Sequence, residues 1–241
     1  MSKVAVVIPA RYGATRFPGK PLALLWGRPM VQHVWEKCQA ASGIDRVVVA
    51  TDDSRILTAC AGFGAEAVMT DSALPSGTDR VAAAAEDMGQ YDIILNVQGD
   101  EPGMEPEVIA AVAGLMRMPD VSIGTAVVPT ARVEDLARPH VVKAVVAQDG
   151  RALYFSRSVV PFERNKLQNS PYFRHLGIYG FRRQVLAELV KLPPSPLEQV
   201  ESLEQLRWLE AGYEIRTVSV NSSSVGVDTP EDLQTISLRT H

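Results

Sequence analysis

Residues 4–22 read Val-Ala-Val-Val-Ile-Pro-Ala-Arg-Tyr-Gly-Ala-Thr-Arg-Phe-Pro-Gly-Lys-Pro-Leu. The unbroken apolar run Val4–Ile8 predicts a buried strand, which leads into a basic, glycine-containing loop. In open α/β sheets ligands gather at the carboxyl ends of the strands, and this loop leaves the carboxyl end of the first strand. The stretch therefore predicts an α/β fold with a binding loop after its first strand. A solvated connection is the plain alternative.

The loop has the chemistry of a polyphosphate site. Arg11, Arg16 and Lys20 supply positive charge, while Gly13 and Gly19 allow backbone N–H groups to approach an anion. The spacing matches neither the G-x-x-x-x-G-K-[ST] pattern of nucleoside triphosphatases nor the G-x-G-x-x-G pattern of dinucleotide-binding proteins. A different class of nucleotide-using protein is indicated.

Strand and helix patterns alternate through the first half of the chain. Strands are expected at Val4–Ile8, Arg46–Ala50, Glu66–Met69 and Ile93–Val97, and helices at Met30–Ala41, Ser54–Phe63 and Asp79–Met88. This order predicts βαβ units with a parallel sheet covered on both faces. The segment Thr51-Asp-Asp-Ser54 is a typical helix start, because short polar side chains cap free N–H groups.

The second half of the chain changes character. Val141–Ala147 and Ala152–Phe155 predict an antiparallel hairpin around the turn Asp149-Gly150. After the hairpin we expect a long loop at Ser156–Tyr172 and a strand at Leu176–Phe181. A helix at Leu197–Ala211, a strand at Ile215–Val220 and a closing helix after Pro230 follow. The chain as a whole is expected to form a single domain, residues 1–241, with a mostly parallel sheet and an added antiparallel hairpin.

Composition narrows the class of protein. A chain of 241 residues with 46% apolar side chains fills one continuous core. A net charge of −4 from 24 basic and 28 acidic residues provides no basic face for nucleic acid. We find no apolar stretch of the roughly 20 residues that a membrane helix needs, and no signal-peptide layout, so a cytoplasmic location without membrane insertion is expected. Cys38 and Cys60 are expected to be free, buried thiols.

Two further segments stand where ligands bind in such folds. Asp92-Ile-Ile-Leu-Asn-Val-Gln-Gly-Asp-Glu-Pro102 is an apolar strand that leads to Asp100. Asp100 is the best candidate ligand for Mg²⁺, since a dication beside a triphosphate is held by one or two carboxylates together with phosphate oxygens. Ser76-Gly-Thr-Asp-Arg80 precedes a helix and combines hydroxyls with an arginine, which suits an anion or the edge of a base. In both segments a simple helix cap is the alternative.

Together these motifs resemble the 3-deoxy-D-manno-octulosonate (Kdo) cytidylyltransferases, the CMP-Kdo synthetases of lipopolysaccharide assembly. The resemblance runs through the whole chain and rests on eight segments in the family's order. They are Ile8-Pro-Ala-Arg11 with Thr15-Arg-Phe-Pro-Gly-Lys-Pro-Leu22, Val49-Ala-Thr-Asp-Asp53, Ser76-Gly-Thr-Asp-Arg80, Gln98-Gly-Asp-Glu-Pro102, Ala152-Leu-Tyr-Phe-Ser-Arg157, His175-Leu-Gly-Ile-Tyr179, Leu203-Glu-Gln-Leu-Arg207 and Gly226-Val-Asp-Thr-Pro-Glu-Asp-Leu233.

The resemblance implies a Rossmann-like, GT-A-like nucleotidyltransferase sandwich of three layers, which transfers CMP from CTP to Kdo and works as a homodimer. About residues 1–130 would form the nucleotide-binding half, and about 131–230 the half for sugar binding and dimerisation. The implied CTP contacts are Ala10, Arg11, Gly13, Lys20, Ser76, Gly77, Arg80 and Gln98. The implied sugar contacts are Arg157, His175, Tyr179, Glu204 and Gln205. Asp100 and Asp228 would hold Mg²⁺ and, with Lys20 and Arg11, would form the catalytic set.

The chemistry of the sugar agrees with this assignment. The carboxylate of Kdo needs a cation or hydrogen-bond donors, such as Arg157 and His175, and its hydroxyls need neutral partners, such as Gln205 and Tyr179. The chain departs from the family pattern at Ala14 and Phe17, where Ser and Leu are expected, and in a shorter loop at 161–172. The nucleotide site is therefore the firmer half of the assignment.

Three alternatives remain open from the sequence. The first is a cytidylyltransferase for another acidic sugar, such as 8-amino-Kdo or a sialic acid. The second is a glycosyltransferase that uses nucleotide sugars, although such enzymes usually present D-x-D and this strand ends in Gly-Asp-Glu. The third is a module that binds a nucleotide without catalysis.

Overall fold

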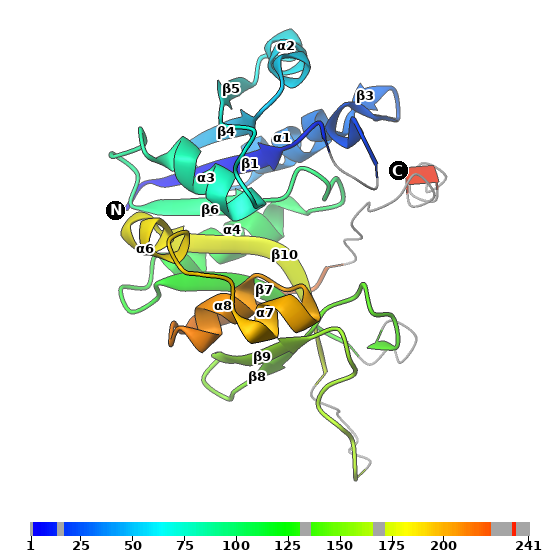
Figure 1. Ribbon diagram of the computed structural model, residues 1–241, viewed down its shortest axis with the longest axis vertical. Helices are drawn as coiled ribbons and strands as arrows, with labels where there is room; N and C mark the ends of the chain where they lie inside the picture. Colours follow the sequence, from blue (N-terminus) through cyan, green and yellow to red (C-terminus); the bar gives the residue numbers. More distant parts are fainter. Residues whose placement is uncertain (1, 14–16, 131–135, 166–171, 223–232, 235–241) are drawn as a thin grey trace.

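A nine-stranded mixed sheet forms the centre of the molecule (Figure 1). The computed structural model describes residues 2–13, 17–130, 136–165, 172–222 and 233–234. The main path of the sheet runs β11-β7-β10-β6-β1-β4-β5. Its strands are β1 Val4–Ala10, β4 Arg46–Thr51, β5 Glu66–Met69, β6 Ile93–Val97, β7 Ile123–Pro129, β10 Phe173–Arg182 and β11 Ile215–Ser219.

Only β10 runs against the other strands of this path. Strands β1, β4, β5 and β6 pair in parallel, as do β7 and β11, whereas β10 pairs antiparallel with both β6 and β7. The hairpin of β8 (Lys143–Val146) and β9 (Ala152–Ser156) adds to β10 through β8. The α/β fold with a mostly parallel sheet and an antiparallel hairpin is confirmed. The two functional halves stay a prediction.

Helices cover both faces of the sheet and give the three layers. One core cluster joins the sheet to α1 (Met30–Ala40), α2 (Ser54–Gly62) and α4 (Pro106–Met116). The other joins it to α3 (Gly77–Ala85), α6 (Arg183–Leu189), α8 (Gln205–Glu210) and the β8–β9 hairpin. All seven residues of β1 are buried, because this strand lies in the middle of the sheet with helices on both sides.

The prediction of a single helix at Leu197–Ala211 is wrong. The segment is divided into α7 (Pro196–Glu201) and α8, because Ser202 between them adopts the left-handed conformation with φ 52°. The Arg157 guanidinium donates to the carbonyl oxygens of Glu201 and Ser202, and this side chain therefore caps the end of α7. The break lets Leu206 and Trp208 on α8 pack into the core, while α7 buries none of its residues.

The sequence did not predict several elements, and one predicted element lies mostly outside the described residues. The sequence did not predict β7, the short hairpin of β2 (Leu24–Leu25) and β3 (Arg28–Pro29), or the turn η1 (Lys20–Leu22). The closing helix expected after Pro230 falls largely outside the described residues. Cys38 and Cys60 are free and buried, and burial raises the pKa of the Cys60 thiol to about 11.

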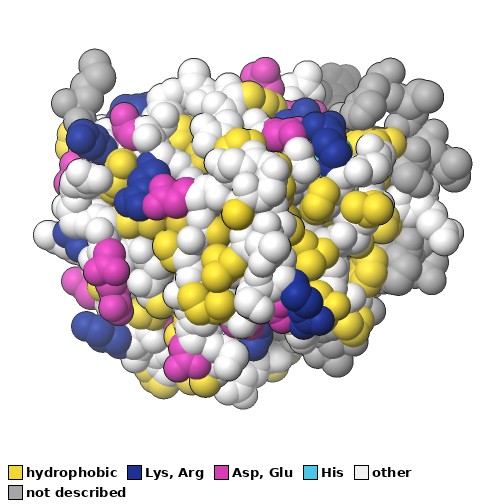
Figure 2. Space-filling view, turned by 90° about the horizontal axis from the view of Figure 1, so that it is seen from above, with side chains coloured by type: hydrophobic (Ala, Val, Ile, Leu, Met, Phe, Trp, Pro, Cys, Tyr) yellow, Lys and Arg dark blue, Asp and Glu magenta, His cyan; other side chains and the backbone are white. Residues whose placement is uncertain are grey.

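The surface agrees with the modest net charge. On the face shown in Figure 2, basic and acidic side chains are interspersed with apolar atoms and no large area carries one charge. Among the residues described, none of the helices has the length and apolar character needed to cross a membrane.

Candidate active site

The predicted ligand segments meet at the switch point of the sheet. The chain passes from β1 to β4 on one side of β1 and later forms β6 on its other side, and such a reversal leaves a crevice at the carboxyl ends of the strands. Gly99, just after β6, approaches β1 so closely that a Cβ atom there would lie 2.9 Å from the Pro9 carbonyl oxygen. Only glycine permits this approach, which brings the first loop and the Gly-Asp-Glu segment together.

Lys20 and Asp100 form the central polar contact of this crevice. The Lys20 Nζ atom donates to Asp100 Oδ2 at 2.7 Å. Lys20 is only 7% exposed and begins η1 directly behind Gly19, whose φ of 72° suits glycine. The Gly19 N–H donates to the Tyr12 carbonyl oxygen at 2.8 Å, which closes the loop on itself. Two residues that are 80 positions apart in the sequence thus share one site.

The fit of a magnesium ion rests on Asp100. Its carboxylate offers the hard oxygen atoms that Mg²⁺ prefers, and the Lys20 ammonium already places a positive charge against it. The second predicted carboxylate, Asp228, lies outside the described residues. Within the described ranges no cluster of three or more His, Cys, Asp and Glu side chains is arranged around a common point. The donor set shown here fits a metal that takes further oxygen ligands from a nucleotide.

Asp52 joins the loop after β1 to helix α3, and from the sequence it was expected only to start a helix. Its carboxylate accepts from Arg80 Nη2 at 3.0 Å and from the Tyr12 N–H at 3.4 Å, and it lies 3.7 Å from Arg11 Nε. Arg80 is fully buried and also donates to the Thr70 hydroxyl. Burial lowers the pKa of this guanidinium, while the Asp52 charge opposes the shift.

Arg80 was predicted as a nucleotide contact, and the structure places its guanidinium against Asp52, which also accepts from the Tyr12 N–H. Its Nε atom is buried without a hydrogen-bond partner within the described part of the chain. Arg11, in contrast, is exposed and reaches the Ser72 carbonyl oxygen at 3.5 Å. The doublet Asp52-Asp53 directly after a buried strand is the sequence signal that could have revealed the link.

The remaining predicted nucleotide contacts line the same edge. Ser76 is the N-cap of α3, and its hydroxyl accepts from the Asp79 N–H at 3.1 Å. A Cβ atom on Gly77 would lie 3.4 Å from both amide atoms of Gln98, so α3 and the end of β6 are in contact. Ala10 is buried at the end of β1. Gly13 is exposed, a Cβ atom there would meet nothing, and its φ is not positive, so no steric need for glycine is visible.

Of the predicted sugar contacts, His175 and Tyr179 lie together on β10 among aromatic rings. Their ring centroids are 5.3 Å apart, with Phe155 against His175 and Trp208 against Tyr179, each at 5.0 Å. Tyr179 Oη is buried without a hydrogen-bond partner among the described residues, and burial raises the pKa of this phenol. A buried hydroxyl of this kind is ready to bond a polar ligand.

His175 was expected to offer the sugar carboxylate a positive charge or a hydrogen-bond donor, and burial favours its neutral form. Burial lowers its pKa to about 3, with the Arg174 charge as a smaller cause. The Thr125 hydroxyl donates to the Ile178 carbonyl oxygen at 2.7 Å, so it accepts from His175 Nε2 at 3.0 Å. The imidazole therefore carries its proton on Nε2 and keeps Nδ1 as an acceptor, which suits a sugar hydroxyl.

Arg157 is held at the junction of α7 and α8. Its Nε, Nη1 and Nη2 atoms donate to the carbonyl oxygens of Glu201, Pro139 and Ser202, at 2.7, 3.1 and 3.1 Å. The Glu201 carboxylate accepts from the Arg157 N–H at 2.9 Å. The buried Lys143 ammonium donates to three carbonyl oxygens, including that of Arg157. Arg157 thus has a structural role that the sequence did not reveal.

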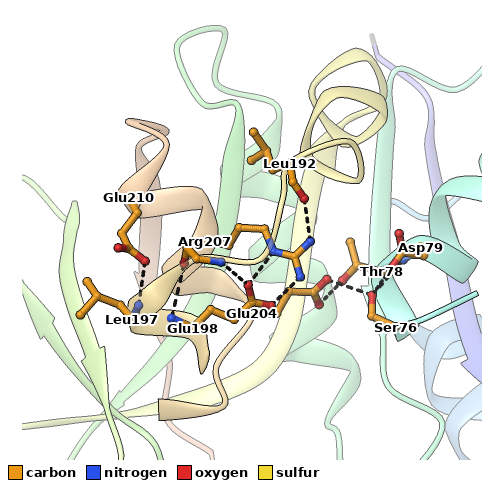
Figure 3. A network of polar contacts seen from close by, with 10 residues as sticks. Ser76, Thr78, Asp79, Leu192, Leu197, Glu198, Glu204, Arg207 and Glu210 are labelled. Carbon is orange, nitrogen blue, oxygen red and sulfur yellow. Dashed lines mark hydrogen bonds and ion pairs between the residues drawn. The ribbon is translucent and has the colours of Figure 1, made fainter. Parts of the chain in front are cut away.

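Glu204 brings the two predicted sets of contacts together (Figure 3). Its carboxylate accepts from the Ser76 hydroxyl at 2.9 Å and from the Thr78 hydroxyl at 2.7 Å. Burial raises the pKa of this carboxyl, and these two hydrogen bonds oppose the shift. Gln205 follows at the start of α8 and is 5% exposed. Hydrogen bonds therefore join the start of α3 directly to the start of α8.

Comparisons with known proteins agree with this arrangement. A family model described as Cytidylyltransferase matches residues 5–215. The chain is 51% identical over 234 residues to a 3-deoxy-manno-octulosonate cytidylyltransferase of Myxococcus xanthus (strain DK1622), covering 97% of this chain and 95% of the relative. It is 45% identical to the protein of that name from Zea mays, covering 98% of this chain and 80% of the relative.

Solved structures show the same likeness. A structure of CMP:2-keto-3-deoxy-manno-octonic acid synthetase complexed with CTP matches with a TM-score of 0.92 at 44% identity, covering 98% of this chain and 97% of the other. A 4-diphosphocytidyl-2C-methyl-D-erythritolsynthase from Anaerococcus prevotii DSM 20548 matches with a TM-score of 0.65 at 10% identity, covering 98% and 95%. The second likeness is one of fold alone.

Proposed function

The chain belongs to the cytidylyltransferase family, and from this premise we propose that it transfers CMP from CTP to the anomeric hydroxyl of Kdo. The products are CMP-Kdo and pyrophosphate. The observation that carries the proposal is the contact of Lys20 with Asp100 at the carboxyl ends of β1 and β6, beside the loop that bears Arg11. The names of the relatives favour Kdo over another acidic sugar.

The reaction needs no covalent intermediate on the enzyme. The anomeric oxygen of Kdo attacks the α-phosphorus of CTP in line, a new P–O bond forms, and the bond to the β-phosphate oxygen breaks. The hydroxyl proton leaves to solvent, and pyrophosphate departs with its electron pair. The enzyme orients the two substrates and neutralises charge, with Arg11 and Lys20 on the phosphates.

Asp100 and Asp228 would hold the magnesium ion. When bound, Mg²⁺ supplies positive charge beside the α-phosphate and lowers the pKa of the attacking hydroxyl. Asp100 accepts from Lys20 in the structure, so Lys20 and a bound dication would both place positive charge against this carboxylate. The magnesium requirement rests on this carboxylate and on the family resemblance.

Pyrophosphate release tests the reaction and the sugar together. CTP and Mg²⁺ would be offered with Kdo, with 8-amino-Kdo and with a sialic acid, and a chelator would serve as the control without metal. We expect metal-dependent release with Kdo. Release with another sugar alone would overturn the Kdo assignment and keep the nucleotide site. Binding of CTP without release would favour a module that lacks catalysis.

Two variants test the catalytic roles. Asp100→Asn should lower kcat far more than it weakens CTP binding, and a nearly normal kcat would remove Asp100 from the metal site. Lys20→Met should raise the barrier by about 2–4 kcal/mol if its ammonium stabilises charge in the transition state. An unchanged kcat would exclude Lys20 from the mechanism.

We further propose that the protein acts in the cytoplasm and supplies CMP-Kdo for lipopolysaccharide assembly. We also propose that it forms a homodimer through the end of the molecule that carries the β8–β9 hairpin (Figure 1). Large apolar side chains are exposed on β9, on the segment behind it and on α7: Leu153 at 53%, Val159 at 47%, Phe162 at 88% and Val200 at 83%. Apolar atoms gathered on one surface favour a protein interface. Sedimentation should show a dimer for the natural chain and a monomer for Phe162→Glu, and a monomeric natural chain at micromolar concentration would refute the interface.

A further inference from the structure

Thr78 has no role in the reaction as described so far, although it is one of the few buried polar residues near the site. Its side chain is 3% exposed, and its Oγ1 atom donates to Glu204 Oε2 at 2.7 Å. The two residues are 126 positions apart in the sequence. Thr78 belongs to the first turn of α3, whereas Glu204 is the N-cap residue of α8.

The two hydroxyls that reach Glu204 are not equivalent. Ser76 Oγ lies 2.9 Å from Glu204 Oε1 and 2.6 Å from Asp79 Oδ2. A serine hydroxyl carries a single hydrogen, so it donates to only one of these carboxylates at a time. Thr78 Oγ1 has Glu204 as its sole hydrogen-bond partner within the described ranges. Thr78 therefore donates to Glu204 alone, whereas Ser76 can donate either to Glu204 or to Asp79.

Glu204 stands on a braced element. The Arg207 guanidinium pairs with Glu198 through Nε at 2.7 Å and Nη2 at 2.5 Å, and its Nη1 donates to the Leu192 carbonyl oxygen at 3.1 Å. These contacts tie α8 to α7 and to the chain behind α6, as Figure 3 shows. These contacts hold the backbone of Glu204 in place. A shift of the Ser76–Thr78 turn therefore changes the orientation of the Glu204 carboxylate directly.

We propose that Thr78 is a positioning residue that, through Glu204, couples sugar binding to nucleotide binding. The inference rests on the proposed function, in which Ser76 and Gly77 contact CTP while Glu204 and Gln205 contact the sugar acid. A nucleotide that orders the Ser76–Thr78 turn also fixes the Glu204 carboxylate in the orientation that Thr78 dictates. The sugar then binds a Glu204 carboxylate that is already oriented, so sugar binding no longer bears the entropic cost of orienting this side chain.

Linkage makes the effect reciprocal. If a bound nucleotide tightens sugar binding by some factor, bound sugar tightens nucleotide binding by the same factor. Couplings between sites in proteins commonly begin at about fivefold. We expect at least that factor here, because one hydrogen bond joins the two sets of contacts without an intervening residue.

Calorimetric titration of Kdo into the full-length protein measures the coupling. The Kd for Kdo is compared with and without saturating α,β-methylene-CTP, a nucleotide that cannot release pyrophosphate. The natural chain should show a Kd at least about fivefold lower with the nucleotide, the factor at which such couplings commonly begin. Thr78→Val should bring the ratio close to one while leaving the Kd of the nucleotide alone little changed, and Thr78→Ser should restore the ratio.

Thr58→Val is the control, because the Thr58 hydroxyl also makes one hydrogen bond, to the Ser54 carbonyl oxygen, but lies on the exposed side of α2. It should leave the ratio unchanged. The coupling would be overturned if Thr78→Val kept the ratio between the Kd values for Kdo without and with the nucleotide. It would also be overturned if the Kd for Kdo of the natural chain did not change with the nucleotide. If circular dichroism shows that Thr78→Val is unfolded, Thr78→Ala replaces it under the same criterion. Pyrophosphate release by the natural chain separately tests the proposed function, so the two failures are distinguishable.

Discussion

Replacement of Asp52 by alanine should destabilise the protein strongly, because it leaves a buried charge without its partner. The Arg80 side chain is fully buried, and its Nη2 atom donates to Asp52 at 3.0 Å. In Asp52→Ala the guanidinium would keep its hydrogen bond to Thr70, but it would lose the one carboxylate that it contacts among the described residues. Its Nε is already without a partner among the described residues. The same substitution removes the acceptor of the Tyr12 N–H.

The magnitude follows from this burial. Removal of one member of a buried ion pair typically costs about 3–5 kcal/mol, since the remaining charge stays desolvated. For a chain of this size that loss lowers the melting temperature by roughly 6–20 °C. Because Tyr12 and Arg11 belong to the loop that is proposed to bind CTP, the variant should also raise the KM for CTP.

Thermal or urea unfolding followed by circular dichroism measures the loss. Asp53→Ala is the matched control: Asp53 is the neighbouring acid, it caps α2 by accepting from the Arg55 N–H, and its other partner is the exposed Arg55 side chain. This control should lose markedly less stability and keep the KM for CTP. If Asp52→Ala lost no more than Asp53→Ala, the Arg80 guanidinium would not depend on Asp52, and the reasoning would be refuted.

Three further outcomes are expected. The folded-state pKa of His175, about 3, lies below its unfolded value of 6.5, so the unfolded chain binds the proton more tightly and stability is lost as the pH falls below 6.5. That loss amounts to about 2 kcal/mol at about pH 5, and urea unfolding of His175→Gln should show a smaller decrease between pH 7 and 5 than the natural chain. Gly180→Ala would drive a Cβ atom into the Met116 side chain and should cost about 1–3 kcal/mol in unfolding free energy. Gly114→Ala, on open space in α4, is its control and should not destabilise. Gly19→Ala should cost about 1–2 kcal/mol, because alanine is strained at φ 72°, and equal stability would show that the loop can change its conformation.

The first half of the fold follows from local pattern because β1, β4 and β6 are almost fully buried apolar strands. The edge strand β5 is only partly buried, but its short run is bounded by polar residues and glycine. Glu66–Met69 and Ile93–Val97 have the predicted bounds to the residue. In contrast, β7 was not predicted although Ile123–Val128 is buried. Its glycine and its final proline weaken the strand pattern, and the strand is stabilised by pairing with β10 and β11.

The break in the helix at Ser202 could not be predicted from local pattern. Leucine spacing continues from Leu197 to Leu209, and the decisive contact is the Arg157 guanidinium, which comes from β9 and its following segment. Asp52 was hidden for a related reason. Its position before a helix explains an acid there without any distant partner, and only the fold shows that Arg80 lies against it. Lys20 and Asp100 were each expected at a carboxyl strand end, and the structure brings the two side chains into contact.

The contacts of Arg157 bear on how the sugar acid is recognised. A guanidinium has five N–H groups, and three are engaged with the carbonyl oxygens of Pro139, Glu201 and Ser202. One hydrogen remains on each terminal nitrogen, which is the number that a carboxylate needs for a bidentate pair. Arg157 therefore has enough donors to cap α7 and to bind the sugar carboxylate at once. Because burial keeps His175 neutral, Arg157 is the cation left among the five predicted sugar contacts. The carbonyl oxygens that end α7 hold the guanidinium that would bind the sugar carboxylate.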